Sequence, residues 1–263
     1  MRRKISDLAS KVWTRVRRDG LYVASRYYVR ASMHGAHYLV YDRRWDRFDA
    51  CRTSGAVTPE EADVVGETGS LEKARYQAMA RLPLIWALKA LDLNSSEFGF
   101  IDYGSGRGRL MLTAARSPFR QVLGVEFSRP LHQEARENIR SYPREHLACT
   151  DIAALHANAL EFDLPDGDWV AFFFNPFAED VLQRVARRIV ESCQGSPRRA
   201  YVIFGNSDRL PVLRNIPGFK RIRPRGLHAV LLKTLAPVPF EFFVVEPPAK
   251  GKPRSASSQS PGP

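Results

Sequence analysis

The chain has 263 residues, of which 44% are hydrophobic and 26% are charged. This is the composition of a globular protein and excludes disorder along the whole chain. No stretch approaches the roughly 18–20 consecutive apolar residues of a transmembrane helix, and the N-terminus lacks the apolar core of a secretory signal. The three cysteines, at positions 51, 149 and 193, are scattered. They match no zinc or disulfide pattern, so we expect no metal site and a reducing, cytoplasmic location.

The net charge of +12 is distributed unevenly along the chain. Residues 1–56 carry 13 Lys/Arg against 5 Asp/Glu, and residues 249–263 carry three Lys/Arg and no acid, which leaves +1 for residues 57–248. We therefore predict a basic N-terminal helical extension (1–56), a catalytic domain (57–248) and a disordered basic tail (249–263). Because the basic charge belongs to the two terminal segments, nucleic acid is not favoured as the substrate.

The beginning of the chain has the pattern of a basic amphipathic helix. Its apolar residues share one helical stripe, and lysines and arginines surround them: Ile5, Leu8, Val12, Trp13 and Val16. Such a helix either lies on an anionic membrane surface, which would make the protein peripherally membrane-associated, or packs its stripe against the rest of the protein. The sequence leaves both interpretations open.

The central region alternates between apolar runs and helical patterns, which is typical of a parallel α/β sheet. The region 71–91 is predicted to be a helix interrupted by Pro83, whereas 41–51 has no clear pattern. The other predicted helices are Arg109–Arg116, Pro130–Ser141 with Ser128 as N-cap, and Glu179–Ser192. The predicted strands are Phe98–Tyr103, Gln121–Phe127, Ile152–Ala157, Trp169–Phe174, Ala200–Phe204, Leu227–Leu232 and Phe240–Val245. The last two, with no helix between them, predict a terminal antiparallel hairpin.

The strongest local signal is the segment 100–110, with the sequence FIDYGSGRGRL. A strand that ends in a glycine-rich turn and continues as a helix is typical of a nucleotide-binding corner. The dinucleotide fingerprint G-x-G-x-x-G/A does not fit, because its last position falls on Arg109 or Met111, depending on the starting glycine. In addition, the carboxylate of Asp102 would repel a pyrophosphate and suits a ligand that carries an ammonium group and no phosphate.

These residues resemble the class I S-adenosylmethionine-dependent methyltransferases, over about residues 70–246. Their first motif is an acidic residue followed by G-x-G-x-G, as at 102–108, and their second is an acid that closes the next strand, here Glu126. Their third motif lies near adenine after the following strand, where this chain has Asn158 in place of a common Asp. The resemblance implies a Rossmann-like seven-stranded sheet with helices on both faces. The residues that it implies for S-adenosylmethionine, or the product S-adenosylhomocysteine, are Asp102, Gly104, Ser105, Gly106, Gly108, Glu126, Phe127, Asn158 and Ala159.

Candidate catalytic residues follow the fourth strand, at Asn175-Pro176-Phe177. Family members that methylate amines often have Asn or Asp, Pro and an aromatic residue at this place. An Asn carbonyl oxygen can accept a hydrogen bond from an amine and orient its lone pair, and an aromatic ring can stabilise a sulfonium. The alternative interpretation is a strand capped by an Asx turn, with Phe177 in the core. Tyr76 is a third candidate, for the cofactor or the amine channel, and 52–55 is a candidate loop over the site.

The resemblance is nearest to bacterial relatives of lysine methyltransferases. It implies a methyltransferase that acts on an amine nitrogen such as a protein lysine. A small-molecule, lipid or RNA methyltransferase is the alternative, and a non-catalytic binding protein is a third hypothesis, against which the intact Asp102, glycines and Glu126 argue. Acceptor specificity lies in loops and appended segments that one sequence does not decode.

Overall fold

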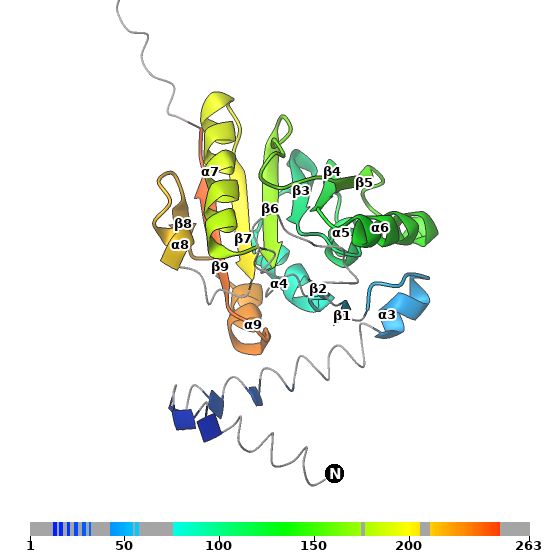
Figure 1. The fold of residues 1–263 in the computed structure, drawn as a ribbon, viewed down its shortest axis with the longest axis horizontal. Coiled ribbons are helices and arrows are strands. Elements are labelled where there is room, and N and C mark those ends of the chain that lie inside the picture. Colours follow the sequence, from blue (N-terminus) through cyan, green and yellow to red (C-terminus); the bar gives the residue numbers. More distant parts are fainter. Residues whose placement is uncertain are drawn as a thin grey trace, which may run out of the picture.

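The main feature of the structure, a computed structural model, is a seven-stranded sheet (Figure 1). The structure describes residues 13–14, 16–17, 20–21, 24–25, 28–29, 32, 43–54, 56–57, 76–174, 177–205 and 211–247. The strands of the sheet are β3 (Phe98–Tyr103), β4 (Gln121–Glu126), β5 (Ile152–His156), β6 (Asp168–Phe174), β7 (Ala200–Gly205), β8 (Lys220–Ile222) and β9 (Phe240–Val245). Their order is β5-β4-β3-β6-β7-β9-β8. The first five in this order are parallel, and β9 is antiparallel to both β7 and β8.

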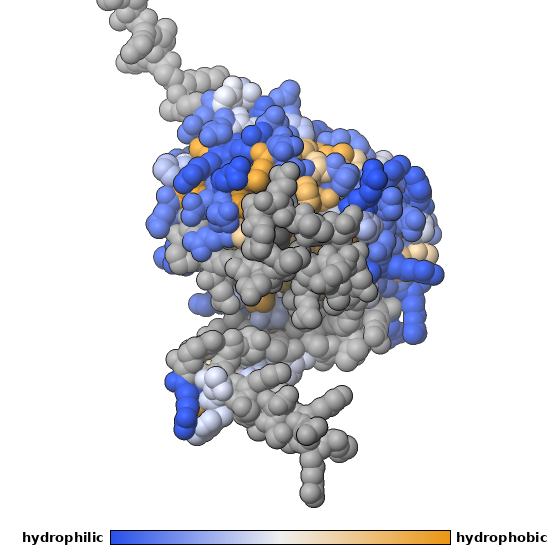
Figure 2. Space-filling view, in the orientation of Figure 1, coloured by the Kyte–Doolittle hydropathy of each residue, from blue (hydrophilic) through white to orange (hydrophobic). Residues whose placement is uncertain are grey.

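Helices cover both faces of this sheet. They are α4 (Arg81–Leu91), α5 (Arg109–Ala114), α6 (Arg129–Ser141), α7 (Glu179–Gly195), α8 (Pro211–Arg214) and α9 (Leu227–Leu235). Two 3-10 turns, η3 (Ser95–Glu97) and η4 (Arg144–His146), join elements at the periphery. Three short elements precede the sheet: α3 (Arg43–Phe48) and the antiparallel strands β1 (Ala56–Val57) and β2 (Tyr76–Gln77). Figure 2 shows that the outer surfaces of α6 and α7 are largely hydrophilic, as expected for helices that bury one apolar face.

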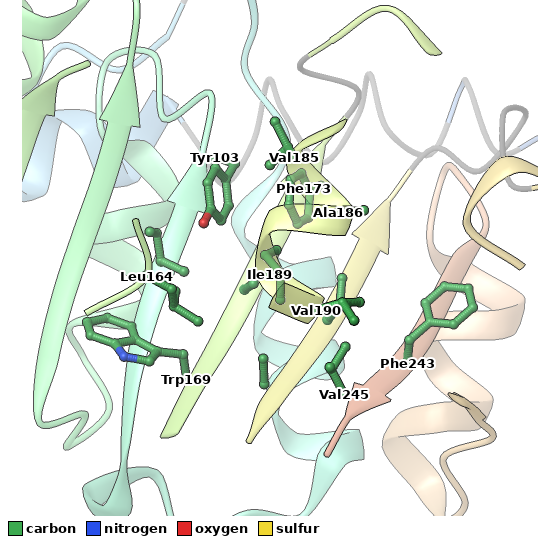
Figure 3. Close-up of a cluster of buried hydrophobic side chains, with 14 of the residues drawn as sticks. Tyr103, Leu164, Trp169, Phe173, Val185, Ala186, Ile189, Val190, Phe243 and Val245 are labelled. Atoms are coloured by element: carbon green, nitrogen blue, oxygen red, sulfur yellow. The ribbon is translucent and has the colours of Figure 1, made fainter. Parts of the chain in front are cut away.

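The core consists of two apolar clusters, one on each face of the sheet. Alternation along β3 explains the division, because Ile101 and Tyr103 belong to one cluster and Phe98 and Phe100 to the other. The first cluster packs against α7, and Figure 3 shows Val185, Ala186, Ile189 and Val190 over the sheet side chains. The second cluster packs against α4, α5 and α9. A sheet that is covered on both faces explains the nearly continuous apolar sequences of β3, β6 and β7.

The predicted fold class is confirmed, and two predicted elements are wrong. The segment Leu227–Leu232 is not a strand but the beginning of helix α9, and the edge partner of β9 is Lys220–Ile222. A short apolar run does not separate a strand from a buried helix, and here Leu232 packs against the second cluster. The antiparallel closing pair therefore exists, but a helix connects its strands.

The predicted helix over 71–91 begins only at Arg81, because Tyr76–Gln77 is a strand. Pro83 does not interrupt this helix. It lies in the first turn, where its missing N–H is not needed as a donor. Other predictions fall outside the described residues: most of the N-terminal stripe, residues 58–75 and the tail from 248. Within the described part, no helix has the length and apolarity needed to cross a membrane.

Candidate functional site

The turn between β3 and α5 has the tight geometry that its glycines predict. Gly104, Gly106 and Gly108 all have positive φ angles, of 77°, 52° and 79°, a region that side chains other than glycine rarely adopt. Gly108 is the N-cap of α5, so the helix begins directly from the turn. The chain thus reverses at the carboxyl end of β3, beside the carboxyl ends of β4 and β6.

The backbone amides of this turn are already used within the protein. Gly104 and Ser105 donate to the carbonyl oxygen of Val125, at 2.8 and 3.2 Å, and Gly108 donates to Ser105 at 2.9 Å. The amide of Gly106 donates to the carboxylate of Glu126, at 2.7 Å. A pyrophosphate needs such amides as donors, so the turn is not built as a phosphate cradle.

Glu126 ends β4 with its carboxylate buried against the turn. Besides Gly106, it accepts a hydrogen bond from the amide of Ser128, at 2.8 Å. Burial raises the pKa of Glu126, although the bonds from Ser128 and Gly106 oppose the shift. Each carboxylate oxygen keeps lone-pair capacity for a further donor, such as a ligand hydroxyl.

Asp102, on β3 next to β4, is the second buried carboxyl at this edge. Burial, and then the nearby charge of Glu126, raises the pKa of Asp102 to about 8. Two acids that repel each other in a buried place favour a cation between them. This donor set therefore fits a ligand with a positive charge and hydroxyl donors.

Ser105, another predicted cofactor residue, lies close to the neighbouring strand. A Cβ added at Gly124 would lie 2.7 Å from both the Cβ and the Oγ of Ser105, and 2.1 Å from the sulfur of Met111. Only glycine at position 124 allows the turn to approach β4 this closely. The buried Ser105 Oγ has no hydrogen-bond partner among the described residues.

The predicted adenine-side residues surround the ends of β4 and β5. Phe127 is 49% exposed, and its carbonyl oxygen lies 2.9 Å from Nε2 of His156. Asn158 uses its side-chain oxygen to accept from the amide of Leu160, at 3.0 Å, so it forms an Asx turn. Ala159 is buried in the first cluster. The loop is thus held by local bonds beside the exposed ring of Phe127.

The structure describes only part of the predicted catalytic group. Phe177 packs against the first cluster, with its ring centroid 6.4 Å from that of Phe173 in an edge-on arrangement. The backbone of Tyr76 belongs to β2, opposite Val57. Asn175 and the side chain of Tyr76 lie outside the described residues, so their catalytic roles stay predictions. Among the residues that the structure does describe, no cluster of acids, histidines and cysteines could hold a metal ion.

A buried ionic network joins residues 43–54 to the same corner. Asp46 pairs with Arg81 of α4, at 3.0 Å, and with Arg109 of α5, at 3.5 Å. It also accepts hydrogen bonds from the hydroxyls of Thr53 and Ser54, at 2.7 and 2.5 Å. Burial alone would raise the pKa of Asp46, but these hydroxyls and the two guanidinium groups outweigh it, so the pKa lies below its ordinary value.

Residues 52–54 also contact the glycine turn directly. The carbonyl oxygen of Ser54 accepts from the guanidinium of Arg107, at 2.6 Å. Asn138 of α6 accepts from the amide of Arg52, at 2.7 Å, and donates to the carbonyl oxygen of Arg107, at 2.9 Å. One side chain therefore bridges the outer segment and the turn. A cavity of about 550 Å³ opens beside this contact and is lined by Asp46, Arg47, Cys51, Arg52, Ser54, Arg107 and Glu134.

The sequence predicts 52–55 as a candidate loop over the site, and residues 52–54 do contact the glycine turn, but the buried network that holds them was not predicted. Arg109 served only to exclude a dinucleotide, whereas the structure shows its side chain 2% exposed and bonded to Thr53, at 2.9 Å. The available signal was the density of Asp and Arg over 43–54, which equally fits a solvated surface. Partners as far apart in sequence as Asp49 and His146 cannot be paired from one sequence.

Comparisons with known proteins find methyltransferases among the solved structures. Mitomycin 7-O-methyltransferase MmcR is 19% identical, with a TM-score of 0.44, over 63% of this chain and 53% of its own, so the chain spans about half of its length. An RNA methyltransferase from Salinibacter ruber, in complex with S-adenosyl-L-homocysteine, is 16% identical, with a TM-score of 0.42, over 68% and 97% of the two chains. Magnesium protoporphyrin IX methyltransferase ChlM from Synechocystis PCC 6803, with bound SAM, is 12% identical, with a TM-score of 0.45, over 83% and 97%. No family model and no curated protein matches the chain.

The network predicts a large loss of stability when Asp46 is changed to alanine. The substitution removes the carboxylate that pairs with the buried Arg109 and one of the two that pair with the buried Arg81, which keeps Asp49 at 2.9 Å. Removing one partner of a buried ion pair typically costs about 3–5 kcal/mol. We expect the free energy of unfolding in urea to fall by that amount. Asp163→Ala is the matched control, because Asp163 pairs with Arg188 while its side chain is 87% exposed, and such surface pairs contribute about 0–1 kcal/mol. Equal losses in the two variants would contradict a stabilising role for the network.

The raised pKa of Asp102 predicts a pH dependence of stability. Its folded pKa of about 8 exceeds the unfolded value of about 4, so the folded state binds more protons between these pH values. The stabilisation is fully present below about pH 4 and is lost as the pH rises towards 8. Without ligand, we expect the melting temperature of the wild type to fall more steeply between pH 5.5 and 8.5 than that of Asp102→Asn. Parallel curves for the two proteins would show that Asp102 does not titrate in this range.

Proposed function

We propose that this chain is an S-adenosylmethionine-dependent methyltransferase. The observation that carries the proposal is the pair of buried carboxyls, Asp102 and Glu126, beside a glycine turn whose amides are bonded internally. S-Adenosylmethionine has an ammonium group, a sulfonium and two ribose hydroxyls, and it has no phosphate. Its charges and donors therefore match this site, whereas a dinucleotide does not.

The proposed roles divide between the two acids and the turn. Glu126 would accept hydrogen bonds from the ribose hydroxyls, and Asp102 would favour the cationic methionine end. Charge-assisted bonds of this kind contribute about 1.5–3 kcal/mol each. Phe127, which is 49% exposed, would contact the adenine. When bound, the cofactor supplies a methyl group that is activated by the sulfonium, and the protein orients the acceptor towards it.

For the acceptor, we propose an amine nitrogen such as that of a protein lysine. The support is the sequence Asn175-Pro176-Phe177, which directly follows β6, the strand that lies beside β3 in the sheet. An amide oxygen at this edge would accept an N–H hydrogen bond from the neutral amine and so direct the lone pair of the amine nitrogen towards the transferred methyl group. The nitrogen would gain the methyl as the methyl–sulfur bond breaks, and the methylated amine would then release a proton to solvent. The aromatic ring of Phe177, half-buried after the same strand, would line the approach.

Calorimetry tests the cofactor proposal. The wild type should bind S-adenosylmethionine and S-adenosylhomocysteine but not NAD, and Glu126→Ala should lose at least about tenfold in affinity. Glu191→Ala is the control, since this exposed carboxylate of α7 is not among the predicted site residues. Both variants must melt like the wild type for the comparison to count. NAD binding by the wild type, or equal affinities in the two variants, would contradict the proposal.

The proposed amine chemistry predicts a different result for Asn175→Ala. This variant should keep its affinity for the cofactor and lose turnover, because Asn175 is assigned to the acceptor amine and not to the cofactor. The substrate can be found by incubating the protein with methyl-labelled cofactor and a cell extract, then separating protein, lipid and RNA fractions. Label outside the protein fraction would contradict a protein lysine as the acceptor, and a wild-type rate for Asn175→Ala on the labelled acceptor would overturn the role of Asn175. Neither result would contradict the cofactor proposal.

A further inference from the structure

Helix α9 has apolar residues on both sides, although only one side packs on the protein. Leu232 is buried on the side that faces the second cluster, which includes α4. On the other side, Leu227 is 67% exposed and Val230, one turn further along the helix, is 57% exposed. A helix at the surface of a protein in water normally turns polar residues outward. The exposed stripe of α9 therefore fits a partner that is itself apolar.

The sequence before and within this helix is basic. The segment 211–240 contains six Lys/Arg and no Asp or Glu, so the near-neutral charge of the central region is not evenly spread. Three of these six residues pair with acids that follow the segment: Arg214 and Arg221 with Glu241, and Lys220 with Glu246. Arg223 and Arg225, both exposed, precede the helix. Apolar side chains flanked by guanidinium groups match the interface of an anionic membrane, with its acyl chains below and its phosphates above.

We infer that the surface formed by Arg223, Arg225, Leu227 and Val230 docks on an anionic phospholipid bilayer. An RNA partner would use the arginines but leave Leu227 and Val230 without an apolar contact. A second copy in a two-fold dimer would bring the same positive charges together. The basic N-terminal segment of this chain, which carries nine Lys/Arg against three Asp/Glu over residues 1–42, is repelled for the same reason. Charge and apolarity together select the bilayer.

The place of α9 in the fold gives this surface a consequence for the site. In Figure 1 the arrows of β6 and β7 point towards the end of the molecule where α9 lies. The carboxyl ends of these parallel strands share the edge that holds Asp102 and the glycine turn. Docking through α9 would therefore bring the proposed methyl-transfer edge towards the membrane surface, while the inference itself rests on α9 alone.

Co-sedimentation of the full chain with vesicles tests this surface. The wild type should bind phosphatidylcholine vesicles that contain about 30% phosphatidylglycerol, and bind pure phosphatidylcholine weakly. We expect Arg223→Glu/Arg225→Glu and Leu227→Gln/Val230→Gln each to reduce binding more than tenfold. The matched controls are Arg184→Glu/Arg187→Glu on the exposed side of α7, which makes the same charge change, and Phe48→Gln, which removes another exposed apolar side chain. Both controls should bind like the wild type.

Three results would overturn the inference. The first is wild-type protein that does not bind anionic vesicles. The second is α9 variants that bind like the wild type while removal of residues 1–20 abolishes binding, which would assign the contact to the N-terminal segment. The third is a wild-type dimer, or a complex with poly-uridine RNA, that the α9 variants disrupt while vesicle binding is unchanged. All variants are first required to melt like the wild type, and none of the substituted residues belongs to the proposed cofactor site.

Discussion

Asp46 is the carboxylate on which three parts of the chain converge. It bonds to Thr53 within its own segment and pairs with Arg81 of α4 and Arg109 of α5. A buried guanidinium without a partner costs several kcal/mol, so neither helix could keep its arginine in this place without the outer segment. Because Arg109 directly follows the glycine turn, the position of the turn depends on residues 43–54 as well as on the sheet.

The sheet itself could be predicted from the sequence because its strands are short, apolar and separated by clear helical patterns. Six of the seven predicted strands form, and Ser128 caps α6 through a bond from the amide of Leu131. The error at Leu227–Leu232 has a physical cause. An apolar run of this length is compatible with a strand or with a buried helix, and the packing of Leu232 against the second cluster, which the sequence does not show, decides between them.

The candidate site could likewise be predicted only in part from the sequence. Asp102, the glycines and Glu126 are contiguous or at characteristic spacing, so their chemistry can be inferred from sequence. The hydrogen-bond partner of each polar group in the site could not be inferred. The amide of Gly106 donates to the carboxylate of Glu126, and the side-chain oxygen of Asn158 accepts from the amide of Leu160. The bridge from Asn138 to both sides of the corner joins residues 86 positions apart, and no local pattern marks it.

The burial of two acids at one edge also connects stability with ligand binding. Without a cation, Asp102 is held partly in its neutral form, since burial and the charge of Glu126 disfavour a second negative charge. A ligand with an ammonium group favours the ionised form of Asp102, so binding and release of its proton are coupled. The empty site has no positive charge to compensate its two acids. A bound cation therefore stabilises the folded protein more than it would if it bound a neutral pocket of the same shape. The residues that we propose for the cofactor are therefore also those that leave the empty fold less stable near neutral pH.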